Sequence, residues 1–199
     1  LSDADLSNAN LNYAGLTSTN LIGANLTGAD LSYTYLWEAD LSDANLTGAD
    51  LEGADLRSAN LRYADLIGVI LYDADLDYAD LRYADLSDAN LSDAYLVYAT
   101  LNNADLTDAD LTDADLNGVS AINLQACPAY LPINWQCVKN NLIGPVASLR
   151  NADLTDADLT DADLHDADLT DADLTGADLT GADLWGAELW QTMFRNADL

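Results

Sequence analysis

The sequence predicts an all-β solenoid, and three observations lead to this fold class. Leu recurs at every fifth position in two long tracts, a small residue stands two places before almost every such Leu, and 50% of the 199 residues are hydrophobic despite a net charge of −29. One dominant core residue suits a core that repeats one geometry. The charge alone would be typical of a disordered chain, but disorder also requires low hydrophobicity. The mean hydropathy of −0.04 therefore argues against disorder.

The spacing of the Leu residues fits neither a helix nor a flat sheet. Every fifth residue from Leu1 to Leu116 is Leu, and the spacing resumes from Leu149 to Leu199, interrupted only by Phe194, so Leu fills 34 of 35 central positions. A helix would rotate successive Leu by about 500°, and a strand would alternate them between two faces. A chain that turns a corner every five residues points each Leu toward one axis. Four right-angle corners close a coil of about 20 residues.

Stacked coils explain the remaining positions of the unit. Neighbouring coils lie about 4.8 Å apart, so backbone groups form hydrogen bonds between coils and Leu stacks on Leu. The Ala two places before each Leu shares the narrow interior, whereas the other three residues of each unit face water, which is where Asp and Asn occur. The two tracts predict about eight to nine coils and a rod about 41 Å long.

The unit Ala-(Asp/Asn)-Leu-x-x resembles the motif of the pentapeptide-repeat family, and the resemblance covers both tracts. It implies a right-handed quadrilateral parallel β-helix. The many Asp-Leu units are similar to those of the cyanobacterial members. We expect a first repeat tract at 1–118, an inserted non-repeat loop at 119–146, and a second tract at 147–199 that continues the first.

The expected loop differs sharply from the rest of the chain in composition. It contains all three prolines and the only lysine, and no acidic residue occurs between Asp115 and Asp153. Prolines disfavour ladder pairing, so we expect this segment to leave the coil, with a helical turn around residues 135–141. A long segment without repeats is functional or disordered. Candidate interaction residues within it are Tyr130, Trp135 and Lys139.

Cys127 and Cys137 also lie in this segment, with nine residues between them. No His or third Cys is near enough in the sequence to complete a zinc site, and a redox motif needs two intervening residues. A disulfide is the preferred interpretation, and two buried thiols are the alternative. A disulfide would indicate an oxidising compartment such as the thylakoid lumen or periplasm, whereas free thiols would indicate the cytoplasm.

Two further groups of residues stand out from the repeat. Arg62 and Tyr63 recur one coil later as Arg82 and Tyr83, which suggests a binding patch or, alternatively, ordinary packing between neighbouring coils. The C-terminal tract ends with Trp185, Trp190, Met193 and Phe194. Because the end of a solenoid exposes its core, these residues are candidates for a cap or for a surface that pairs two copies.

The composition argues against several functions. The single histidine, His165, stands at an outward position, a rod filled with Leu leaves no interior pocket, and carboxylates that face water lack the raised pKa of a catalytic acid. We therefore expect no enzyme activity, no catalytic residue, no cofactor and no specific metal site. The negative charge disfavours direct nucleic-acid binding, and no apolar run is long enough to span a membrane.

The sequence favours a structural or protein-interaction module, in which an acidic rod presents a non-acidic loop to an unidentified protein. The alternative follows from the family resemblance, since some pentapeptide-repeat proteins mimic duplex DNA and protect or inhibit DNA gyrase. The charge density is compatible with that alternative, because 41 Å of duplex carries about 24 phosphates, compared with a net charge of −29 here.

Overall fold

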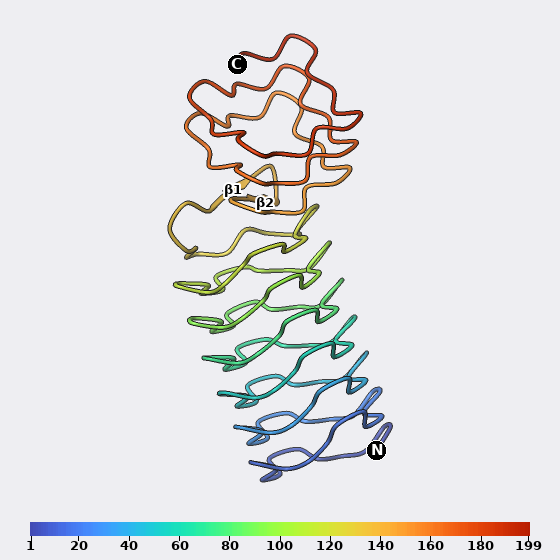
Figure 1. The fold of residues 1–199 in the computed structure, drawn as a ribbon. Helices are drawn as coiled ribbons and strands as arrows, with labels where there is room; N and C mark the ends of the chain where they lie inside the picture. Colours follow the sequence, from blue (N-terminus) through green and yellow to red (C-terminus); the bar gives the residue numbers. More distant parts are fainter.

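Each five-residue unit forms one side of a coil and ends in a tight turn. In the first unit, the N–H of Ala4 donates to the carbonyl oxygen of Leu1 at 3.1 Å, and Asp3 takes a left-handed backbone conformation with φ of 55°. The same turn bond and the same positive φ recur through both tracts. The computed structural model describes residues 1–199 and stacks the resulting coils into a rod (Figure 1).

Parallel bridges between residues 20 apart join the coils. Asp5 pairs with Asn25, and Asn25 pairs with Asn45, so one residue of each unit belongs to a ladder that runs along the rod. The N–H of Asn25 donates to Ala4 at 2.9 Å, and the N–H of Leu6 donates to Asn25 at 2.7 Å. The four-sided coil of 20 residues expected from the sequence is therefore confirmed.

The Asp or Asn before each central Leu stabilises the following turn, a role that the sequence did not indicate. The Asp30 carboxylate accepts the backbone N–H of Ser32 at 3.1 Å and its hydroxyl at 2.6 Å, and the same local bond recurs from Asp5 to Asp183. Asp and Asn are favoured in turns because their short side chains can accept a backbone N–H two residues later. Much of the negative charge is therefore built into the turns.

The interior is filled by the central Leu and the small residue two places before it. In the first tract, the core extends without a break from Leu21 to Leu124. Where Thr34 replaces Ala, its hydroxyl donates to the Leu11 carbonyl at 2.9 Å, so that a fully buried polar group is satisfied. The packed interior leaves no cavity along the axis of the rod.

The interruption departs from the expected loop at 119–146. Val119 and Ser120 still belong to the sixth coil, and Ala126 and Tyr130 still form bridges to Asp105 and Asp110. Ser148 then bonds to the Val119 carbonyl, so 28 residues separate Ser120 from Ser148 where other coils use 20. The interruption is thus one coil with eight extra residues. Residues 1–120 form six coils, 121–148 a seventh, and 149–199 two and a half more.

The extra residues form a small hairpin instead of the expected helical turn. Strand β1, Gln136–Val138, pairs antiparallel with strand β2, Asn141–Ile143, and Cys137 lies opposite Leu142. Lys139 and Asn140 both have positive φ and make the two-residue turn. All three residues of β2 are buried, so the hairpin returns the chain to the core.

The two tracts share a rod but not one continuous core. The buried residues form one cluster of 42 and a second of 16, and no bridge joins the ladders of the two tracts. In Figure 1 the orange and red coils of the second tract are inclined to those below the hairpin. No helix in the structure has the length and apolar character needed to cross a bilayer.

Candidate functional site

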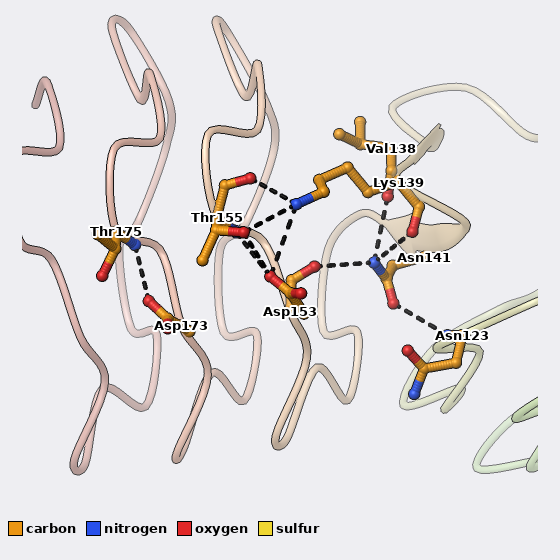
Figure 2. Close-up of polar contacts among 8 residues, drawn as sticks. All are labelled: Asn123, Val138, Lys139, Asn141, Asp153, Thr155, Asp173 and Thr175. Atoms are coloured by element: carbon orange, nitrogen blue, oxygen red, sulfur yellow. Dashed lines mark hydrogen bonds and ion pairs between the residues drawn. The ribbon is translucent and has the colours of Figure 1, made fainter.

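The junction between the two tracts depends on one buried asparagine. Asn141, in β2, is almost fully buried, and its amide nitrogen donates to the carbonyl oxygens of Lys139 at 2.9 Å and Asp153 at 3.5 Å. Its side-chain oxygen accepts the backbone N–H of Asn123 at 3.1 Å. Figure 2 shows this amide between the seventh coil and the second tract. Asn141 therefore binds backbone groups of the seventh coil and of the second tract.

Trp135 connects the two hydrophobic clusters through apolar contacts. Its side chain is partly buried and packs against both hydrophobic clusters. The indole also lies against Gly144, where an added Cβ would come within 2.3 Å of the ring. Gly144 is therefore required for the close approach of the ring. Trp135, which the sequence suggested as an interaction residue, is mainly a structural link between the tracts.

Lys139 also contacts the second tract, through its ammonium group. Its ammonium group donates to the carbonyl oxygen of Thr155 at 2.5 Å and to the Thr155 hydroxyl at 3.0 Å, and it lies 3.6 Å from the Asp153 carboxylate (Figure 2). The hydrogen bonds from Thr155, reinforced by the Lys139 charge, lower the pKa of Asp153. The one lysine of the chain thus fastens the hairpin turn to the second tract.

Cys127 and Cys137 form a disulfide with their Cα atoms 6.0 Å apart. Within the seventh coil, the bond connects the residue after Ala126 to β1 across a separation of 10 residues and so fixes the chain that projects between them. The preferred interpretation of the two cysteines is confirmed.

We expect reduction of this disulfide to lower the free energy of unfolding by about 2.5–3 kcal/mol, because the unfolded chain regains the entropy of the open loop. Urea denaturation with and without reductant measures the difference. The double variant Cys127→Ser/Cys137→Ser is the control and should not respond to reductant. An unchanged midpoint for the wild-type protein after complete reduction would contradict the prediction.

The exposed part of the junction is a short apolar projection. Ile133 is 84% exposed and Tyr130 is 62% exposed, although Tyr130 also belongs to the ladder. No acidic residue is near either of them in the sequence, since acids are absent between Asp115 and Asp153. Ile133 was not singled out from the sequence, but its place between Pro132 and the disulfide-linked β1 could have suggested it.

A small cavity of about 160 Å³ lies beside this projection. It is lined by Asn134, Trp135 and Gln136 on one side and by Asp161, Ala162 and Asp163 of the second tract on the other. Next to it, Nδ1 of His165 lies 2.6 Å from the Asp163 carboxylate. This contact raises the pKa of His165 above its ordinary value of 6.5.

We expect Asp163→Asn to lower the pKa of His165, because the variant loses the charged hydrogen-bond acceptor. His165 is the only histidine, so its ring protons titrate without overlap in an NMR pH series. The ion pair with Asp163 should stabilise the fold fully below the unfolded pKa, and this contribution should be lost as the pH rises through the folded pKa. A pKa that is the same in both proteins would refute the prediction.

The Arg and Tyr residues predicted as a patch lie on one side of the first tract. The Tyr63 and Tyr83 rings stack with centroids 4.9 Å apart, and the Arg62 guanidinium lies 5.5 Å from the Tyr63 centroid. Arg82 pairs with the neighbouring Asp80 carboxylate at 2.5 Å. These contacts match the packing between coils that the sequence left open, while both rings remain about half exposed.

The C-terminal candidates occupy different kinds of position in the last coil. Trp185 and Trp190 stand at outward positions on successive sides and are 75% and 65% exposed. Met193 occupies a ladder position paired with Asp173, and Phe194 replaces the central Leu and packs against the second core cluster. Of these four residues only Phe194 faces the interior. A cap or a surface that pairs two copies at this end remains a prediction.

The carboxylates are dispersed over the surface. No group of three or more His, Cys, Asp or Glu side chains is arranged to hold a metal ion. The described arrangement instead offers a filled rod, an acidic surface and one projection without acids.

Comparison with known proteins supports this description. The family model for pentapeptide repeats matches residues 1–37, 24–62, 54–93, 84–120, 147–176 and 172–199. No curated protein sequence matches the chain significantly.

Three solved structures illustrate the similarity. HetL, a pentapeptide repeat protein involved in heterocyst differentiation regulation in the cyanobacterium Nostoc sp. strain PCC 7120, is 33% identical with a TM-score of 0.50, over 99% of this chain and 87% of HetL. A pentapeptide repeat protein from the Arabidopsis thaliana thylakoid lumen is 30% identical with a TM-score of 0.27, over 53% and 70% of the two chains. QnrB1, a plasmid-mediated fluoroquinolone resistance protein, is 17% identical with a TM-score of 0.43, over 97% and 90%.

Proposed function

Because the chain belongs to the pentapeptide-repeat family, we propose that it is a non-catalytic protein-interaction module that presents its non-acidic junction to a partner protein. The observation that carries this proposal is the exposed projection around Ile133 in a stretch without any acid, on a rod with a net charge of −29. An exposed apolar patch, here Tyr130 and Ile133, that is surrounded by a charged surface is typical of a contact surface.

The way the projection is held supports the same role. A disulfide, the Asn141 amide and the Lys139 contacts fix the chain on both sides of Ile133. A surface that is already ordered loses less conformational entropy when it binds. HetL, which is similar over nearly the whole chain, is involved in the regulation of heterocyst differentiation. A regulatory protein can act through its surface alone, and the filled interior of this rod leaves only the surface for contacts.

The disulfide also bears on the compartment. Disulfides persist in oxidising environments and are rare in the cytosol. We therefore propose a thylakoid lumen or periplasm as the compartment of this protein. The same bond weakens the alternative of a gyrase-directed DNA mimic, because gyrase acts in the cytoplasm. Many of the carboxylates are also engaged in turns, which makes the surface charge a consequence of the fold.

Deleting the whole segment is not a useful test, because residues 121–130 and β2 belong to the coil stack. Ile133→Glu introduces a charge at the tip instead, and the matched control Thr160→Glu adds the same charge at an exposed outward position of the second tract. We expect affinity purification from source cells to lose its specific partner with Ile133→Glu and to retain it with Thr160→Glu. Equal recovery with both variants would oppose the proposal.

A further inference from the structure

One side of the first tract collects exposed aromatic side chains. Its ladder runs through Gly15, Tyr35, Asp55, Asp75, Tyr95 and Asp115 in successive coils. The one or two residues that follow each central Leu on this side also face outward, and they include Trp37, Tyr78 and Tyr98. We define the aromatic face as Tyr35, Trp37, Tyr78, Tyr95 and Tyr98, all of which are between 45% and 60% exposed.

The opposite side of the coil shows that the fold does not require these rings. Its ladder is formed by Asp5, Asn25, Asn45, Asp65, Asp85 and Asp105, and none of its outward residues is aromatic. We call this side the plain face. Both faces have the same backbone bonds and the same buried Leu and Ala. The rings are therefore an addition to one face, since the repeat folds without them on the other.

Packing between coils explains only part of the aromatic face. The Tyr78 and Tyr98 rings stack at 5.3 Å, and Tyr98 lies over Gly118, where an added Cβ would meet the ring at 2.4 Å. Tyr35, Trp37 and Tyr95, however, stack with no other ring in the structure. Three large exposed side chains are thus left without a stacked aromatic partner.

Acidic groups lie between the two ends of this face. Tyr35 and Tyr95 are three coils apart, about 14 Å along the rod. The ladder positions between them hold Asp55 and Asp75, and Arg57 lies 2.7 Å from Asp55 and 3.4 Å from Asp75. Asp77 is in the same unit as Tyr78 and accepts the N–H of Val97 at 2.8 Å. Three carboxylates with one guanidinium leave the centre of the face negative.

We propose that the aromatic face binds an extended, arginine-containing segment of a partner protein. Guanidinium groups stack on aromatic rings and pair with carboxylates, and this face offers rings at both ends and carboxylates between them. A spacing of about 14 Å corresponds to four or five extended residues. The net charge of −29 opposes a second copy of the chain or a nucleic acid as the occupant. This surface is separate from the projection around Ile133.

Hexa-arginine amide is a suitable probe of the full-length protein at physiological salt. We expect its titration to shift the Trp37 indole N–H signal in NMR and to leave the backbone signals of the plain face unchanged. In calorimetry, Trp37→Ala/Tyr95→Ala should bind roughly five- to thirtyfold more weakly, which corresponds to two lost cation–π contacts. The matched control Ile67→Ala/Thr47→Ala on the plain face should bind within about twofold of wild type.

Three outcomes would overturn this inference: shifts spread evenly over all sides of the rod, equal affinity for the two double variants, or self-association in sedimentation that only Trp37→Ala/Tyr95→Ala abolishes. Trp37 and Tyr95 are exposed, and Thr47 and Ile67 are partly exposed at outward positions, so melting curves of all variants should coincide and exclude unfolding as the cause. Binding of hexa-arginine amide should be the same for Ile133→Glu and for wild type, because that variant leaves the aromatic face unchanged. The two proposals can therefore fail separately.

Discussion

Asn141→Leu should destabilise the protein by about 3–5 kcal/mol. The variant removes the amide that satisfies the Lys139 and Asp153 carbonyls and the N–H of Asn123, and each buried group left without a partner costs about 1–3 kcal/mol. Urea denaturation followed by circular dichroism measures the change.

Asn117→Leu is the matched control for this experiment. Asn117 is exposed, and its side chain takes part in no hydrogen bond in the structure, so its replacement should change stability by less than about 0.5 kcal/mol. If the two variants were equally stable, Asn141 would not hold the junction together.

Trp135→Ala is expected to cost about 2–4 kcal/mol, somewhat less than a fully buried tryptophan, because Trp135 is only partly buried. The indole contacts both hydrophobic clusters, so its loss should also uncouple the tracts. Calorimetry should then resolve two unfolding transitions instead of one, since each coil of a solenoid depends mainly on its neighbours.

Trp185→Ala removes an indole of the same size that is 75% exposed, and it should leave a single transition within about 0.5 kcal/mol of wild type. A single transition for Trp135→Ala with unchanged stability would show that the tracts are joined by other contacts.

The repeat was predictable because its physics is local. A Leu every five residues with Ala two places earlier allows few arrangements other than a coil with four corners, and the pairing of Asp5 with Asn25 then follows from counting. The turns were only partly foreseen. Asp and Asn were interpreted as solvated groups, but their bonds to the backbone N–H two residues later explain why these residues recur at that position.

The junction could not be predicted in detail because it depends on contacts between distant segments. The lack of acids marked the segment, and the spacing of Cys127 and Cys137 was compatible with a disulfide, but no periodic pattern indicated that Ala126 and Tyr130 remain in the ladder. The same limit applies to Trp135 and Lys139. Both are unusual for this chain and are candidate interaction residues in the sequence, whereas in the structure each contacts the second tract.

The aromatic face can be derived from the residue numbers, but not from a search for aromatic residues 20 positions apart. Tyr35 and Tyr95 share a ladder three coils apart, so they never contact each other, although a count modulo 20 places them on one side. Tyr63 and Tyr83, the pair that the sequence indicates, lie on another side and stack on each other.

Site-specific photo-crosslinking tests the central claim most directly, namely that the junction contacts a partner protein. A benzophenone amino acid at position 133 should form one dominant crosslinked species in source cells, and the same group at position 160 should form none. The disulfide-reduced protein should lose the crosslink at position 133, because the projection is no longer fixed. Identical crosslinking patterns from positions 133 and 160 would contradict the account.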